Sequence, residues 1–99
     1  MIHVLAVITA KPGQRAAILE AFHTNIPAVH AEAGCIEYGP VIDTLDSPAK
    51  YGENTFVVIE KWESAAHLKA HAVSPHMAAY GAKTREFVES RTIHLMQNG

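Results

Sequence analysis

Two segments of this chain are apolar on both faces of the extended strand that each would form. They are Ile2–Thr9 and Thr55–Trp62, and both are rich in the β-branched and aromatic side chains that favour strands. Successive strand residues point to opposite faces, and here apolar residues occupy both faces. In the first segment one face carries Val4, Ala6 and Ile8 and the other carries Leu5 and Val7. In the second segment one face carries Phe56, Val58 and Trp62 and the other carries Val57 and Ile59. Strands of this kind need cover on both sides, so neither can lie in a sheet with one face open to water.

A helical period of apolar residues begins at about Gln14, after the break at residues 11–13. The residues recur at steps of four, four and three, which places them on one helix face: Ile18, Phe22, Ile26 and Val29. Pro27 falls inside this pattern and has no backbone N–H, so we expect a kink or a short second segment there. Gly34 ends the helical element.

A second strand is predicted over Cys35–Asp43. Pro40 lies within it and cannot donate to a strand ladder, so this strand belongs at a sheet edge or beside a bulge. Residues 44–54 are mostly polar and form a loop that is longer than a tight hairpin needs.

Two short helices and a last strand follow Trp62. Ser64 is placed to cap a helix from Ala65, which carries apolar residues and one histidine on its inward face, at Leu68, His71 and Ala72. Ser74 and Pro75 predict a second short helix, with the serine as cap and the proline at the first helical position. Phe87–Met96 is the predicted fourth strand.

The order of elements is β-α-β-β-α-β, which predicts an α+β, ferredoxin-like antiparallel sheet with helices on one face. A chain of 99 residues forms one domain, here over 1–99. The helices leave the second sheet face uncovered, although the two strands described first are apolar on that face too. We therefore expect a homodimer in which two copies pack through the sheet face.

Composition excludes several classes of protein. Charged residues are 18% of the chain and the net charge is -2 with histidine neutral, which argues against a nucleic-acid partner. One cysteine rules out an intrachain disulfide framework. No span approaches the ~20 apolar residues that cross a bilayer, and no signal peptide is visible. We expect no membrane partner and a cytoplasmic protein.

Four short runs stand in order along the chain after the opening Lys11–Gln14, namely Glu32–Tyr38, Phe56–Ser64, Ala66–His71 and Ser74–Tyr80. In this order and spacing they resemble the antibiotic biosynthesis monooxygenase domain family, and most of all its bacterial quinol monooxygenases. The resemblance covers essentially the whole chain. It implies a dimeric α/β-barrel of ferredoxin-like subunits, with a pocket between helices and sheet in each.

The resemblance also implies a reaction. Oxygenases of this family use no metal, flavin or haem, so no cofactor is expected. The substrate, a quinol or polyphenol, supplies the electrons and reacts with O2 once it is deprotonated. The protein then has to remove a proton, orient the aromatic ring and stabilise negative charge.

His71 is the first candidate for the catalytic base, because it lies on an inward helix face and imidazole exchanges protons near neutral pH. Glu60 stands inside an apolar alternation, where a carboxylate needs a partner. It could orient His71, or it could pair with a lysine or arginine. Trp62 could form a stacking wall for a flat ring, with its N–H as a donor, or simply pack in the core.

Four further residues are candidates for substrate binding. Asn25 lies on the apolar helix face, where it could hold a substrate oxygen or satisfy backbone disturbed by Pro27. Tyr38 and Tyr80 could line the same cavity or belong to the core. His76 could reach the pocket mouth or remain solvated.

A metal is not expected, although one spacing suggests it. His67 and His71 stand at i and i+4, the spacing of a helical metal pair. A site needs a third ligand, and no spacing rule places His76 or Glu63 beside them.

Three alternatives were considered, and the first is not expected. Haem-degrading relatives resemble this chain but have Trp at the position of His71, His at that of Gly81 and an Asn in the first strand, and none of the three is present here. An isomerase or epimerase acting on small phosphorylated sugars or ketones would also use one base. Its phosphate site would need cations, yet those nearby look solvent-facing, at Lys61, Lys69, Lys83 and Arg85. A non-catalytic module that binds aromatic ligands would consume no O2.

Overall fold

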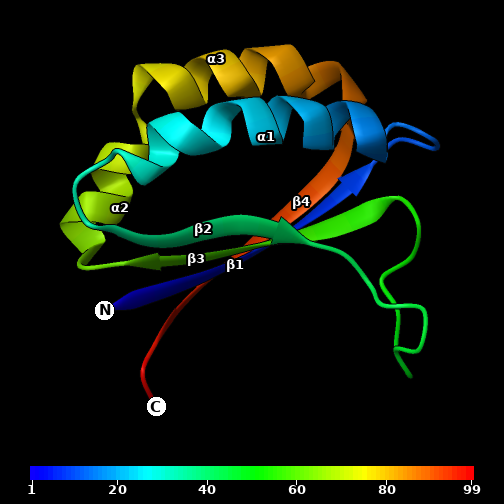
Figure 1. The fold of residues 1–99 in the computed structure, drawn as a ribbon, viewed down its shortest axis with the longest axis horizontal. Helices are drawn as coiled ribbons and strands as arrows, with labels where there is room; N and C mark the ends of the chain where they lie inside the picture. Colours follow the sequence, from blue (N-terminus) through cyan, green and yellow to red (C-terminus); the bar gives the residue numbers. More distant parts are fainter.

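A computed structural model describes all residues, 1–99 (Figure 1). The elements follow in the order β1 (Ile2–Ala10), α1 (Arg15–His30), β2 (Cys35–Val41), β3 (Thr55–Trp62), α2 (Ala65–Ala72), α3 (Pro75–Thr84), a 3-10 turn η1 (Arg85–Phe87) and β4 (Val88–Gln97). The four strands form one antiparallel sheet in the order β2-β3-β1-β4. The predicted α+β, ferredoxin-like fold is confirmed.

The sheet order follows from the strand sequences. β1 and β3 are the two strands that are apolar on both faces, and they pair at the centre of the sheet, with Ala6 opposite Val58. β2 contains Pro40 and lies at an edge, as predicted, because proline has no N–H to offer a further strand. β4 forms the other edge beside β1.

α1 runs from Arg15 to His30 without interruption, so the predicted second segment at Pro27 does not form. Proline leaves the carbonyl of His23, four residues earlier, without its helical donor. Both residues are exposed, so water can satisfy that carbonyl. The buried apolar face at Ile18, Phe22 and Val29 holds the helix on the sheet through this position.

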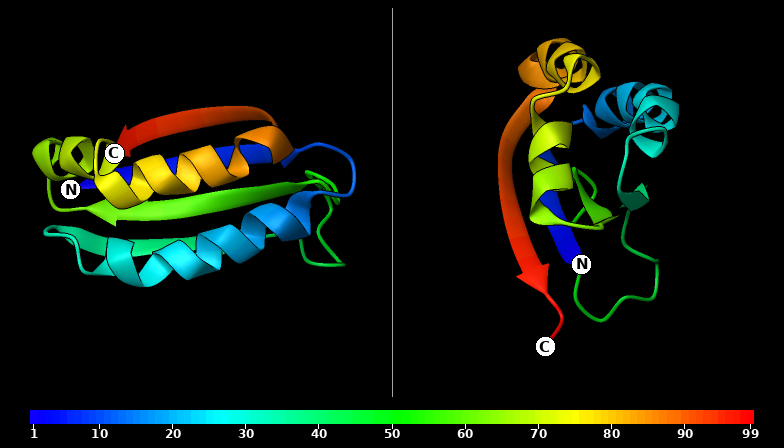
Figure 2. Two further views of the ribbon diagram at one scale, coloured as in Figure 1. Left: turned by 90° about the horizontal axis from the view of Figure 1, so that it is seen from above. Right: turned by 90° about the vertical axis from the view of Figure 1, so that its left-hand side faces the viewer.

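The core lies between the helices and the sheet (Figures 1 and 2). Its largest fully buried side chains are Trp62, Phe22, Phe56, Ile18 and Val29. Phe22 stacks on Tyr38 with ring centroids 4.9 Å apart, which ties α1 to the edge strand β2.

The two serine caps behave differently. Ser64 caps α2 as predicted, because its hydroxyl accepts the backbone N–H of His67 at 3.2 Å. Ser74 precedes α3 and Pro75 stands at its first turn, also as predicted, but the hydroxyl does not cap this helix. It donates instead to the carbonyl of His71 at 2.8 Å and so joins the two helices.

β4 carries exposed apolar side chains on both of its faces. Ile93 pairs with Ala6 and Leu95 with Val4 on the helix side of the sheet, yet they are 54% and 63% exposed. Met96 pairs with His3 on the opposite side and is 43% exposed. Figure 1 shows the cause for the first two, since the C-terminal end of β4 runs away from α1 and α3.

None of the three helices has the length and apolar composition that a membrane span requires.

Candidate active site

A carboxylate and two imidazoles meet where α1, α2 and α3 come together. Glu32 lies in the turn between α1 and β2, His71 lies in the last turn of α2, and His76 lies in the first turn of α3. One oxygen of Glu32, Oε2, is 2.8 Å from Nδ1 of His71 and 2.8 Å from Nε2 of His76. Because a carboxylate only accepts hydrogen bonds, each imidazole donates its N–H to this oxygen.

His71 is held on several sides. It is 4% exposed, its ring lies 4.6 Å from that of Trp62, and the ring of Tyr38 meets it edge-on at 5.4 Å. Its second nitrogen, Nε2, has no protein partner. Because no fully buried polar side-chain atom of the chain lacks a partner, Nε2 keeps some accessible surface. With the proton on Nδ1, neutral His71 has an unprotonated Nε2. This arrangement suits a general base.

Glu60 does not orient His71, and it does not pair with a lysine or arginine. It is 7% exposed, and its Oε1 accepts the indole N–H of Trp62 at 2.9 Å. Burial raises the pKa of Glu60, while the bond from Trp62 and the proximity of His71 counteract that rise. The carboxylate that orients His71 is therefore Glu32, whereas Glu60 accepts its hydrogen bond from the Trp62 indole.

Trp62 cannot serve as a stacking wall in this arrangement, contrary to that prediction. Its exposed fraction is 0% and His71 lies against its ring, so no face is free for a ligand. Its contacts instead connect the buried Glu60 to His71. Trp62 is therefore a packing and positioning residue.

Asn25 and Tyr38 both contact the thioether sulfur of Met77. Asn25 donates to Sδ of Met77 at 3.3 Å, and the Tyr38 hydroxyl lies 4.0 Å from the same sulfur. The Asn25 side chain makes no bond to the backbone around Pro27. Burial raises the pKa of the Tyr38 hydroxyl well above its ordinary value. Tyr38 therefore stays protonated, and it can donate a hydrogen bond but not act as a base near neutral pH.

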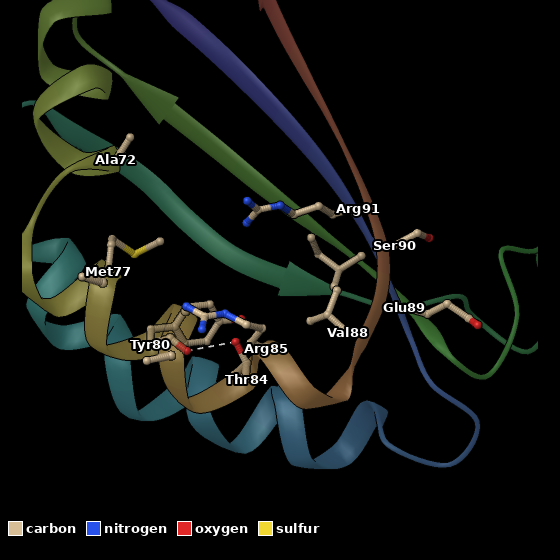
Figure 3. A pocket seen from close by; sticks show the side chains of 13 residues that line it. Ala72, Met77, Tyr80, Thr84, Arg85, Val88, Glu89, Ser90 and Arg91 are labelled. Atoms are coloured by element: carbon tan, nitrogen blue, oxygen red, sulfur yellow. Dashed lines mark hydrogen bonds between the residues drawn. The ribbon is translucent and has the colours of Figure 1, made fainter.

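A cavity of about 650 Å³ lies between α3 and β4 (Figure 3). Of the residues predicted to share one pocket, it is lined by Tyr80 alone, whose pKa burial raises to about 12. Arg85 and Arg91 also line it, and Arg85 is solvent-exposed, as expected. Met77 lines the cavity as well, and it links this space to Asn25 and Tyr38.

The i, i+4 histidine pair does not form a joint site. Nδ1 of His67 lies 2.7 Å from the hydroxyl of Ser64, at the start of α2, while Nδ1 of His71 faces Glu32. His76 was considered for the pocket mouth, and its imidazole is instead bonded to Glu32.

Glu32 was missed because a single glutamate two residues before a turn glycine resembles a solvated surface residue. The one signal that pointed to Glu32 was its place at the start of Glu32–Tyr38, one of the short runs that carry the family resemblance.

Comparison with known proteins agrees with this fold. A family model described as antibiotic biosynthesis monooxygenase matches residues 1–83. The chain belongs to this family. The Escherichia coli K12 protein named "Probable quinol monooxygenase YgiN" is 38% identical, and the similarity spans 100% of this chain and 99% of that one. These matches support a monooxygenase activity.

Solved structures with the same fold include the two that follow. PA3566 from Pseudomonas aeruginosa superposes with a TM-score of 0.82 at 26% identity, over 98% of this chain and 92% of that one. A crystal structure described as an antibiotic biosynthesis monooxygenase gives 0.83 at 23% identity, over 100% and 99% of the two chains. At that identity the second match speaks for the fold alone.

Proposed function

We propose that this monooxygenase needs no cofactor and oxidises a quinol or polyphenol with O2. The observation that carries the proposal is the Glu32–His71 pair, which leaves Nε2 of His71 unprotonated and without a protein partner. Phenolate anions are electron-rich, so removal of a hydroxyl proton prepares the ring to reduce O2. One oxygen atom then enters a ring carbon and the other leaves as water, while the ring is oxidised to a quinone.

His71 takes the hydroxyl proton at Nε2 and becomes an imidazolium. Glu32 accepts the hydrogen bond from Nδ1 and lies 2.8 Å away, so its negative charge stabilises that imidazolium. Glu32 also fixes the ring orientation and the tautomer. His76, bonded to the same oxygen, holds the carboxylate in place.

Asn25, Met77 and Tyr80 are the residues proposed to receive the aromatic ring. The Asn25 carbonyl oxygen has no protein partner, which leaves it free to accept from a substrate hydroxyl. The Tyr80 hydroxyl is likewise without a partner and stays protonated, so it can donate to developing negative charge.

A homodimer remains part of the proposal. The exposed apolar side chains of β4, at Ile93, Leu95 and Met96, support an interface with a second copy. Contact through this edge strand would extend the sheet-face interface expected from the sequence. Sedimentation at increasing protein concentration tests it, and a monomer throughout would refute it.

The activity is tested by O2 consumption with reduced menadione and a panel of polyphenols, with autoxidation subtracted. His71→Ala is expected to reduce the rate by about 10²-fold or more, the usual effect of losing a general base. His67→Ala is the matched control, because it removes a histidine from the same helix without touching Glu32. Incorporation of one labelled oxygen atom from ¹⁸O2 into the product distinguishes a monooxygenase from an oxidase. An unchanged rate in His71→Ala would refute the assigned base.

A second candidate, an isomerase or epimerase of small phosphorylated compounds, is supported by Arg85 and Arg91 beside the large cavity. Guanidinium groups bind phosphate well. Thermal stabilisation by sugar phosphates, lost in Arg91→Gln and accompanied by no O2 uptake with any phenol, would favour this reading.

A further inference from the structure

The cluster of Glu32, His71 and His76 has the composition of a transition-metal site. The three ligand atoms, one carboxylate oxygen and two imidazole nitrogens, all lie within 4.8 Å of one another. Two histidines and one carboxylate, with positions left open, form a common ligand set for divalent transition metals. The three residues come from the α1–β2 turn, α2 and α3, so the tertiary fold brings them together and not their spacing along one helix.

The distances fit an ion after a small adjustment. Each imidazole nitrogen is 2.8 Å from Oε2 of Glu32. Ligands about 2.0–2.2 Å from a tetrahedral ion lie ~3.4 Å apart, so each separation has to widen by about half an ångström. Glu32 lies in a turn, which allows that shift more readily than a position inside a helix would. The His76 side chain is 28% exposed and gives an ion a path inward.

We propose that Glu32, His71 and His76 bind one divalent transition-metal ion of the Zn²⁺ type. In the metal-free protein both imidazoles direct their N–H groups at one oxygen. In the bound form Nδ1 of His71 and Nε2 of His76 direct lone pairs at the ion instead. Imidazole ligands favour zinc over magnesium, which prefers an all-oxygen shell.

Binding of the ion changes the base, a consequence that rests on the proposed function. When Nδ1 of His71 coordinates metal, the ring proton of the neutral imidazole moves to Nε2. That nitrogen then has no lone pair for a substrate proton. The metal therefore inhibits a reaction that depends on His71, so the site acts as a switch between a metal-free active form and a metal-bound inactive form.

Direct binding to the full chain tests the site without reference to activity. Chelator-treated protein is titrated with Zn²⁺ in competition with a chromophoric chelator, and with Co²⁺ while its visible absorption is followed. We expect one ion per chain, a loss of affinity of at least about 10-fold in His76→Ala and in Glu32→Gln, and unchanged affinity in His67→Ala. Mg²⁺ should not compete. His76→Gln serves as a second variant, and circular dichroism checks that each variant is folded.

The outcomes separate the two proposals. No saturable binding overturns the metal site, and so does binding that survives His76→Ala but is lost in His67→Ala. Neither result affects O2 uptake by the metal-free protein. If the site binds Zn²⁺ but no phenol supports O2 uptake, the proposed function fails while the site stands. If both hold, Zn²⁺ should suppress O2 uptake in the unaltered protein, and His76→Ala should require at least about 10-fold more Zn²⁺ for the same suppression.

Discussion

Trp62→Phe tests how the buried Glu60 is stabilised. The indole of Trp62 is fully enclosed and donates its N–H to Glu60 at 2.9 Å. Phenylalanine retains most of the ring but has no donor, and it leaves a small void. The variant therefore removes the one hydrogen bond that protein atoms give to this carboxylate.

The expected loss has two parts. A smaller ring in a closed core costs roughly 1–2 kcal/mol of unfolding free energy. Loss of a hydrogen bond to a charged group costs about 1.5–3 kcal/mol more. The total, about 2.5–5 kcal/mol, applies where Glu60 is ionised. Where Glu60 is protonated only the first part remains.

The sign of the pH dependence follows from the raised pKa of Glu60. The folded protein binds this proton more tightly than the unfolded chain, so this group favours the folded state most at pH values below its ordinary pKa of 4.5. That contribution is lost as the pH rises through the raised pKa. The bond from Trp62 opposes the rise, and Trp62→Phe therefore raises the pKa of Glu60 further. The destabilisation by Trp62→Phe must grow as the pH increases.

Urea unfolding at about pH 4 and about pH 8, at one fixed protein concentration, measures this difference. Glu60→Gln is the matched background, because glutamine keeps the size of the side chain and an oxygen acceptor but cannot ionise. In that background the cost of Trp62→Phe should be the same at both pH values. A cost in the unaltered background that is equal at both pH values would refute the reasoning.

Three further predictions concern single positions. Gly34→Ala should unfold at a lower temperature than Gly13→Ala. Both glycines have positive φ, but only at Gly34 would an added Cβ overlap the ring of His67. Equal melting temperatures would contradict this. The difference in absorbance at 295 nm between the unaltered protein and Tyr80→Phe should titrate with a midpoint of about 12, and a midpoint near 10 would show that Tyr80 is not buried. Pro27→Ala should raise the free energy of unfolding by about 1–2 kcal/mol, because it restores a helical hydrogen bond in α1. Urea unfolding measures this change. A lower stability would mean that the proline is required in the native helix.

The architecture could be predicted because it depends on local pattern. Their apolar and β-branched residues identified β1 and β3 as strands, and Pro40 placed β2 at an edge or beside a bulge; the structure confirms the strands and the edge position. Pro27 was interpreted too strongly, because the packing of the α1 face outweighs one missing backbone hydrogen bond at an exposed position.

The site could be predicted only in part. His71 was identified from its inward helix position, and its confinement by Trp62 and Tyr38 agrees with that assignment. Glu60, which the sequence placed in an apolar strand, was considered as its orienting partner, whereas the structure places Glu32 against it. Sequence periodicity gives the direction of a side chain from its own backbone but not the identity of the group that it meets.

The sequence by itself determined which segments are helices and strands, which faces are apolar and that one histidine points inward. These properties repeat every two or 3.6 residues, so neighbouring residues are enough to reveal them. Only the tertiary structure decided that Glu32 lies against two histidines 39 and 44 residues away. That contact depends on how α1, α2 and α3 pack over the sheet, and packing between distant segments leaves no period in the sequence.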